Sequence, residues 1–189
     1  MSQTKNSTRL LTETAIMSAL SIVLSYIVIF RMPQGGSVSL VLLPLIFLGL
    51  RRGPVWACTA GAICGVVQLM FGGYFLNPLQ VIFDYVLSFG TVGFAGFFAK
   101  PLQGALQEKN QGKIFGYTLA ASFLGGFMAY LNNVISGIVF YAEYTPKGQS
   151  VFAYSTIYNA TYMIPEALAS MVIVWLLAVR APKLFLTDK

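Results

Sequence analysis

The stretch Leu79–Ala99, "LQVIFDYVLSFGTVGFAGFFA", is apolar almost throughout but carries one acidic residue, Asp84. A helix crosses a bilayer with roughly 20 apolar residues, so this stretch predicts a membrane span. An ionisable side chain at membrane depth costs at least roughly 2.5–3.5 kcal/mol and normally faces a cavity or a partner. Two interpretations of Asp84 follow: an interfacial ion pair with Arg31 or Lys147, or a binding site for a cation.

The whole chain has the composition of a membrane protein. Of its 189 residues, 57% are hydrophobic and only 10% are charged, and the mean hydropathy is +0.72. A soluble domain carries roughly 25% charged residues. We therefore predict an all-α integral membrane protein that forms a single membrane domain over residues 1–189.

The sequence lacks the residues and motifs that several kinds of catalysis require. The chain has no histidine, which excludes histidine-based triads and histidine metal ligands. It has no G-x-x-x-x-G-K-[ST] motif, so we predict that it does not hydrolyse ATP itself. Cys58 and Cys64 lie in an apolar run and are expected to be packing residues. The sequence thus predicts no enzyme, no catalytic residue, no metal and no cofactor. A membrane enzyme would need a Ser-Lys arrangement, and no lysine falls within a span.

Turn signals divide the chain into six transmembrane helices. The predicted spans are Leu10–Phe30, Val38–Leu50, Val55–Phe71, Leu79–Ala99, Phe115–Tyr141 and Val151–Val179. The second is short, so we expect it to be tilted or shielded by its neighbours. Asn77 and Pro78 predict a helix start, as an N-cap followed by a first-turn proline.

The basic residues lie mostly on one side of these spans. If the N-terminus is inside, ten of the 12 Lys and Arg residues fall in inner segments and only Arg31 and Lys147 in outer loops. The inner set is Lys5, Arg9, Arg51, Arg52, Lys100, Lys109, Lys113, Arg180, Lys183 and Lys189. This positive-inside pattern predicts that both termini are cytoplasmic. It also explains the net charge of +6 without a nucleic-acid partner.

The outer half of the last two spans is unusually polar. "YLNNVISGIVFY" (130–141) includes Asn133 and Tyr141, and "YSTIYNATYMIPE" (154–166) includes Tyr154 and Asn159. Tyrosines alone could form an interfacial belt, but asparagines in a dry interior need hydrogen-bond partners. With Asp84, the cluster suits a flat, polar, cationic heterocycle in an outward-opening pocket. Glu166 follows Pro165, either as a ligand group or as a partner for polar groups at a helix kink.

Five stretches together resemble one known family, the thiamine-specific S-components (substrate-binding subunits) of bacterial energy-coupling factor transporters. They are "RLLTETAIMSAL", "PQGGSVSLVLLPLIFLGLRRG", "QVIFDYVLSFGTVGFAGFF", "NNVISGIVFYAEYTPKG" and "YSTIYNATYMIPE". The resemblance implies a multi-pass, six-helix protein of the bacterial cell membrane that binds thiamine tightly. It also implies partners: a transmembrane coupling subunit and two ATPase subunits that drive import.

The resemblance also implies roles for individual residues. Asp84 and Tyr85 match an acid-tyrosine pair at the thiazolium, and Tyr154 and Asn159 match a tyrosine and an asparagine at the pyrimidine. Tyr141 stands where members carry an aromatic residue, often tryptophan. Further candidates for the site are Tyr74, Tyr158, Tyr162 and Glu166.

Two departures from the family pattern concern specificity. Well-known members carry histidine where this chain has Asn133, which can donate and accept hydrogen bonds but cannot be protonated. The outer loop "RMPQGGSVS" (31–39) also lacks a tryptophan that some members place there.

A small-xxx-small pattern on the first span is a candidate docking surface. Ala15 and Ala19 lie four residues apart in "AIMSA", and such pairs let helices approach closely in lipid. By resemblance, this pair docks on the coupling subunit. The alternative is internal packing.

Two other functions stay open. One is an S-component for another vitamin or a thiamine precursor. The other is a stand-alone secondary transporter in which Asp84 or Glu166 relays protons.

Overall fold

The computed structural model describes residues 2–33 and 35–187, with side chains from residue 7 onward. Gln34 of the outer loop, the terminal Asp188 and Lys189, and the Lys5 side chain lie outside the described residues. The helices are α1 (Ser2–Ser25), α2 (Leu42–Arg52), α3 (Pro54–Met70), α4 (Pro78–Val81), α5 (Ser88–Thr91), α6 (Ala99–Gln107), α7 (Gln111–Phe140) and α8 (Val151–Arg180). Strands β1 (Phe30–Arg31) and β2 (Ser37–Val38) form a small antiparallel hairpin.

The predicted span Leu79–Ala99 belongs to one longer helical rod, Pro78–Gln107. It begins where the sequence predicts, since the Asn77 side chain accepts a hydrogen bond from the Gln80 backbone N–H at 3.0 Å. Between α4 and α5 the rod contains a π-helical segment, η1 (Ile82–Leu87), and between α5 and α6 a 3-10 segment, η2 (Val92–Phe98). The wide π turn carries Asp84 and was not predicted from the sequence.

Three helices among the described residues are long and apolar enough to cross a membrane. They are Pro78–Gln107, Gln111–Phe140 and Val151–Arg180, and Pro54–Met70 is a shorter apolar helix. Large apolar side chains are exposed along their outer faces, for example Phe123 at 65% and Ile164 at 56%. Such faces are expected of helices that contact lipid. The all-α membrane fold is therefore supported, whereas the count of six spans stays a prediction.

The first two predicted spans have different bounds in the structure. The helix predicted to end at Phe30 ends at Ser25, because Ile29 donates its backbone N–H to Val38 in the hairpin. The second, predicted over Val38–Leu50, is α2, whose 11 residues are too few to cross a bilayer alone. Leu42, Leu45 and Leu48 of α2 are all at most 2% exposed, which confirms that neighbouring helices shield this segment.

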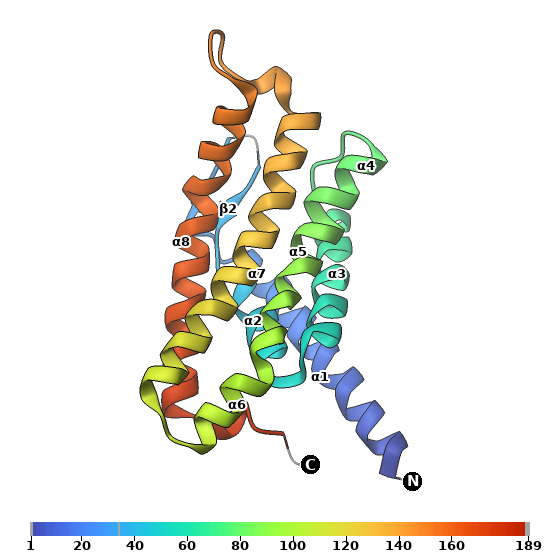
Figure 1. Cartoon of the computed structure of the whole chain (residues 1–189). Helices are drawn as coiled ribbons and strands as arrows, with labels where there is room; N and C mark the ends of the chain where they lie inside the picture. Colours follow the sequence, from blue (N-terminus) through green and yellow to red (C-terminus); the bar gives the residue numbers. More distant parts are fainter. Residues whose placement is uncertain (1, 34, 188–189) are drawn as a thin grey trace.

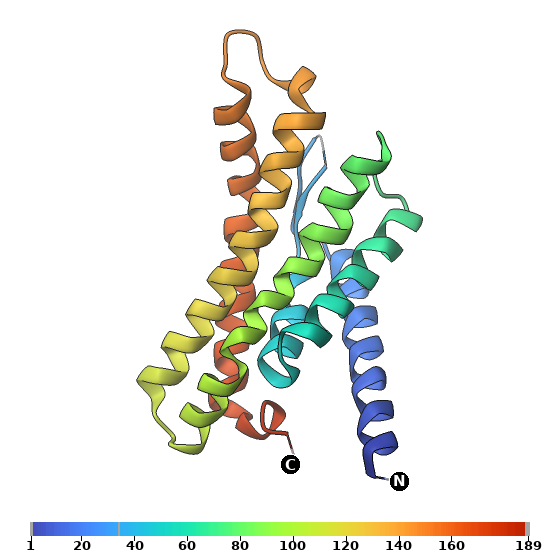
Figure 2. The same ribbon diagram turned by 45° about the vertical axis from the view of Figure 1, so that its right-hand side comes forward.

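The chain folds into a bundle with two distinct ends. The start of α1 and the end of α8 lie at the same end (Figure 1). The hairpin, α4 and the α7–α8 connection lie toward the other end in both views (Figure 2), and strand β2 contacts α8. Helix α3 packs closely on the Pro78–Gln107 rod through glycines, and a Cβ on Gly65 would overlap the Tyr85 carbonyl oxygen. Small residues thus let these two backbones approach.

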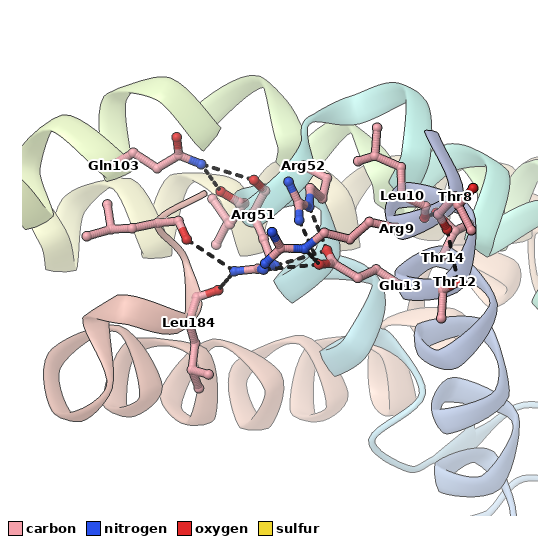
Figure 3. A network of polar contacts seen from close by, with 12 residues as sticks. Thr8, Arg9, Leu10, Thr12, Glu13, Thr14, Arg51, Arg52, Gln103 and Leu184 are labelled. Carbon is pink, nitrogen blue, oxygen red and sulfur yellow. Dashed lines mark hydrogen bonds and ion pairs between the residues drawn. The ribbon is translucent and has the colours of Figure 1, made fainter. Parts of the chain in front are cut away.

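A polar cluster holds together the end of the bundle that carries the termini (Figure 3). The Glu13 carboxylate of α1 accepts hydrogen bonds from Arg9 at 3.3 Å, from Arg51 at 3.0 and 3.1 Å, and from Arg52 at 2.5 and 2.6 Å. Arg51 also donates to the backbone oxygens of Leu184 and Leu186 beyond α8. Glu13 therefore ties α1, the end of α2 and the C-terminal segment together.

Candidate functional site

A cavity of about 520 Å³ lies at the end of the bundle opposite the termini, which is a size typical of small-molecule sites. The hairpin, the α3–α4 loop, the π turn, α7 and α8 all contribute to its walls. Every residue predicted for the substrate site lines it: Asp84, Tyr85, Asn133, Tyr141, Tyr154 and Asn159, together with Tyr74, Tyr158, Tyr162 and Glu166. The structure thus brings together residues spread over about half of the chain.

Asp84 is held by neutral hydrogen-bond donors. Its Oδ2 accepts from Gln80 Nε2 at 2.6 Å and from the Tyr141 hydroxyl at 2.9 Å. Among the ion pairs between described residues, none includes Asp84. The predicted pairing with Arg31 or Lys147 is therefore not supported. A carboxylate that keeps its charge here would be balanced by a cation in the cavity.

Aromatic side chains surround Asp84 on the side of the α3–α4 loop. The ring centres of Tyr74 and Tyr141 are 6.1 Å apart, and those of Tyr141 and Tyr144 are 6.0 Å apart. The hydroxyls of Tyr74 and Tyr144 lie 2.9 Å apart, and this hydrogen bond raises the pKa of Tyr144 above its ordinary value. The Tyr85 hydroxyl accepts a hydrogen bond from the Tyr74 backbone N–H and donates one to the Tyr74 carbonyl oxygen at 3.1 Å. The π faces and the acid thus form an environment that attracts positive charge.

A second aromatic wall comes from α8 and contacts the hairpin. The ring centres of Tyr154 and Tyr158 are 5.7 Å apart, and those of Tyr158 and Tyr162 are 6.3 Å apart. The Tyr158 hydroxyl donates to the Gly35 carbonyl oxygen at 3.0 Å. Gly36 has a φ of +83°, and a Cβ there would lie 2.6 Å from the Tyr162 ring. Glycine is required at this turn for both its backbone conformation and its close approach to the ring.

The two carboxamides differ in how far the protein already uses them. Asn159 Nδ2 donates to the Ser155 carbonyl oxygen at 2.9 Å, and its Oδ1 accepts from the Tyr162 hydroxyl at 2.6 Å. Asn133 Nδ2 lies 3.7 Å from the sulfur of Met163, which is a weak acceptor. The Asn133 side chain also hydrogen-bonds to the Tyr162 hydroxyl. Both carboxamides therefore have partners within the protein, and Asn159 offers mainly the second lone pair of its oxygen.

Glu166 is buried, with 3% of its surface exposed, and it binds the segment before α2. Its Oε1 accepts from the Ser39 hydroxyl at 2.7 Å, and the backbone of Ser39 and Val41 also hydrogen-bonds to the carboxylate. Helix α8 runs unbroken through Pro165. Glu166 was interpreted either as a ligand group or as a partner for polar groups at a helix kink. The geometry favours the second role, but the polar groups that Glu166 binds lie just before α2 and not at a kink of α8.

Two contributors to the site were missed by the sequence interpretation. Gln80 is fully buried behind Asp84, and its position four residues earlier on the same helix could have indicated it. Tyr144 was not among the residues predicted for the site, but it lines the cavity. Among the described residues, no group of three or more His, Cys, Asp or Glu side chains could hold a metal ion.

Comparison with known proteins identifies the family. The profile of the thiamine transporter protein family (Thia_YuaJ) matches residues 11–186. The chain belongs to this family. The thiamine transporter ThiT of Bacillus subtilis is 38% identical over 100% of both chains. ThiT of Lacticaseibacillus paracasei is 36% identical over 92% of this chain and 88% of its own. A solved structure of ThiT from Listeria monocytogenes superposes with a TM-score of 0.90, at 29% identity over 96% of this chain and 100% of that one.

Membership in the thiamine transporter family confirms the resemblance to thiamine-specific S-components. The family consists of transporters, which confirms that the chain is not an enzyme. The high TM-score over nearly the whole chain also supports the arrangement of the helices around the cavity.

Proposed function

We propose that this chain is the substrate-binding subunit of an energy-coupling factor transporter and that it binds thiamine in the cavity beside Asp84. The single observation that carries the proposal is the joining of an acid, two aromatic walls and two carboxamides in one cavity of about 520 Å³. Membership in the thiamine transporter family supports the substrate.

Asp84 and its tyrosines receive the thiazolium ring. The Asp84 carboxylate lines the cavity, is held at Oδ2 by Gln80 and Tyr141, and meets the cation. Tyr74, Tyr85 and Tyr141 present ring faces to the same region, and cation–π contacts add to the attraction of the carboxylate. The positive charge of thiamine is thus neutralised without a metal or a charged partner chain.

The aminopyrimidine lies against α8 and α7. Tyr154 and Tyr158 provide ring faces for stacking, and Tyr162 orients the oxygen of Asn159. That oxygen accepts from the amino group of the pyrimidine, while Asn133 donates to a ring nitrogen. The two carboxamides would in this way distinguish an aminopyrimidine from a ring without these groups.

The orientation in the membrane follows from the charges. The basic residues at the end that holds the termini support a cytoplasmic location of this end in a bacterial cell, with the cavity toward the outside and six spans across the membrane. The chain has no ATP-binding motif. Import therefore requires a transmembrane coupling subunit and two ATPase subunits, which reorient the loaded chain.

Uptake into liposomes tests this division of labour. The chain alone, with a pH gradient in either direction, is expected to give no accumulation of radiolabelled thiamine. Adding the coupling subunit and ATPases with internal ATP is expected to give uptake. Accumulation by the chain alone that follows the proton gradient would overturn the proposal in favour of a secondary transporter.

A further inference from the structure

A buried amide behind the cavity links the cation-binding carboxylate to the outer loop. Gln80 lies in the first turn of α4, has 0% of its surface exposed and does not line the cavity. Its Nε2 donates to Asp84 Oδ2 at 2.6 Å and to the Tyr74 carbonyl oxygen at 3.2 Å. Its Oε1 accepts from the Leu76 backbone N–H at 3.0 Å.

This network allows only one orientation of the Gln80 amide. The Leu76 N–H needs an acceptor, while Asp84 Oδ2 and the Tyr74 carbonyl both need a donor. Turning the amide over would set its oxygen against two acceptors and its NH₂ against an N–H. Both amide protons are therefore committed, and the side chain cannot turn to follow a ligand.

The same contacts hold one oxygen of the Asp84 carboxylate in place. Gln80 and Tyr141 both donate to Oδ2. The hydrogen bond from Gln80 fixes the carboxylate from the rear, and the wide turn of the π segment Ile82–Leu87 allows Asp84 and Tyr85 to line the cavity together. Gln80 and Tyr85 both donate hydrogen bonds to the Tyr74 carbonyl oxygen. These contacts fix the backbone of Tyr74 and thereby the position of its ring, which lines the same cavity.

We propose that Gln80 is a positioning residue that makes the cavity selective for a positively charged ring by fixing the Asp84 carboxylate and the Tyr74 loop. The proposal rests on the proposed function, because the charged ring is the thiazolium of thiamine. Gln80 does not touch the ligand. It acts by keeping the orientation of Asp84 in the empty protein, so that no reorganisation is needed when the cation arrives.

The test compares thiamine with an uncharged isostere in which a thiophene ring replaces the thiazolium. Dissociation constants are measured by isothermal titration for the wild-type chain and for Gln80→Leu. We expect Gln80→Leu to weaken thiamine binding about tenfold, as for the loss of a hydrogen bond to a charged group, and to change binding of the neutral isostere little. Equal loss for both ligands would overturn the proposal and leave Gln80 a purely structural role.

Control variants separate positioning from general instability. Gln103→Leu removes a similar amide, which donates to the Leu50 and Arg51 carbonyl oxygens at the opposite end of the bundle. It should leave the ratio of the two affinities unchanged. If Gln80→Leu does not fold, Gln80→Met keeps the unbranched shape without the amide and is measured in its place.

A double-mutant cycle gives an independent result. In an Asp84→Asn background, Gln80→Met should cost much less thiamine affinity than in the wild type, because the carboxylate that it positions is absent. Additive losses would contradict the proposal. If the wild-type chain binds neither thiamine nor the isostere, the proposed function fails together with the inference. If it binds thiamine and the ratio does not change, only the inference fails.

Discussion

Asp84 and Glu166 are both acids at the cavity, but their surroundings give them different roles. Asp84 lines the cavity, and its Oδ2 accepts hydrogen bonds from Gln80 and Tyr141. Glu166 is 3% exposed and joins α8 to Ser39 before α2. In our proposal, the same residue type therefore provides a binding charge in one place, whereas in the other it holds two segments together.

We predict that Asp84→Asn weakens thiamine binding more than Glu166→Gln does. Loss of the charge at Asp84 removes a charge-assisted contact of roughly 1.5–3 kcal/mol. Glutamine at position 166 can still accept from the Ser39 hydroxyl, so its effect should be smaller and should fall on thermal stability. Titration calorimetry and thermal unfolding of both variants check this, and the reverse ranking of affinities would assign the cation to Glu166.

At the scale of the element, the cluster around Glu13 joins parts of the chain that are distant in sequence. The side chains of Glu13, Arg51 and Arg52 are 19%, 14% and 11% exposed. Ion pairs that are partly buried lose more when one partner is removed than surface pairs do, because the remaining charges stay desolvated. Glu13 should thus matter for stability even though it is far from the cavity.

We predict that Glu13→Gln lowers the free energy of unfolding by on the order of 2 kcal/mol, less than for a fully buried pair. Thermal unfolding in detergent measures the change. The matched control is Glu108→Gln, because Glu108 pairs with Lys113 at 2.8 Å with both side chains at least half exposed. Its effect should be about 0–1 kcal/mol. Equal effects of the two variants would show that the Glu13 cluster adds nothing beyond a surface pair.

Helix α1 has two faces with different neighbours. Thr14, Ser18 and Ser21 are buried, and the Ser18 hydroxyl donates to the Ala60 carbonyl oxygen of α3 at 3.2 Å. Ala15 and Ala19 are both exposed on the other side. Internal packing therefore does not explain the alanine pair, which supports the proposal that it docks on the coupling subunit.

We predict that replacing both Ala15 and Ala19 with tryptophan abolishes uptake and pull-down of the partner subunits but leaves thiamine affinity unchanged. Two bulky side chains fill the groove that a partner helix would enter. The matched control is a tryptophan pair at Ile164 and Leu168, four residues apart on an exposed face of α8. Normal transport by the alanine double variant would contradict the docking role, and loss of binding in detergent would indicate internal packing.

The sequence predicted the long elements well and the irregular ones poorly. The spans at Phe115–Tyr141 and Val151–Val179 match α7 and α8 within a few residues, because their apolar runs end at clear turn signals. The first span was predicted to extend to Phe30 because Ile27, Ile29 and Phe30 are apolar. In the structure, Phe30 instead belongs to strand β1, which pairs with β2. Hydropathy cannot distinguish residues that contact lipid from those that pack in a hairpin.

The site was predictable in its members but not in its hydrogen bonds. Asp84, Asn133 and Asn159 stand out in sequence as polar residues within apolar spans, and all three line the cavity. Gln80 lies at the start of a span, where a polar residue is ordinary, so its burial depends on the loop that folds over it. The commitment of the Asn159 amide to Ser155 and Tyr162 likewise follows from packing rather than from spacing.

At the scale of the whole molecule, the hairpin and the α3–α4 loop, which both contribute to the cavity, lie toward the end of the bundle opposite the termini (Figure 2). The ion pairs of Glu13 lie at the end that carries the termini, and the aromatic walls of the cavity lie toward the other end. A ligand in the cavity therefore lies away from the basic end of the chain. In our proposal, it is released inside only when the partner subunits reorient the whole bundle.

Titration of the purified chain with thiamine is the most direct test of the central claim, that the cavity beside Asp84 binds this vitamin without nucleotide or partners. Isothermal titration in detergent, with quenching of tyrosine and tryptophan fluorescence as a second signal, measures it. We predict saturable one-to-one binding of thiamine and no binding of riboflavin or biotin. Absence of heat and quenching with thiamine, together with clear binding of another vitamin, would contradict the account.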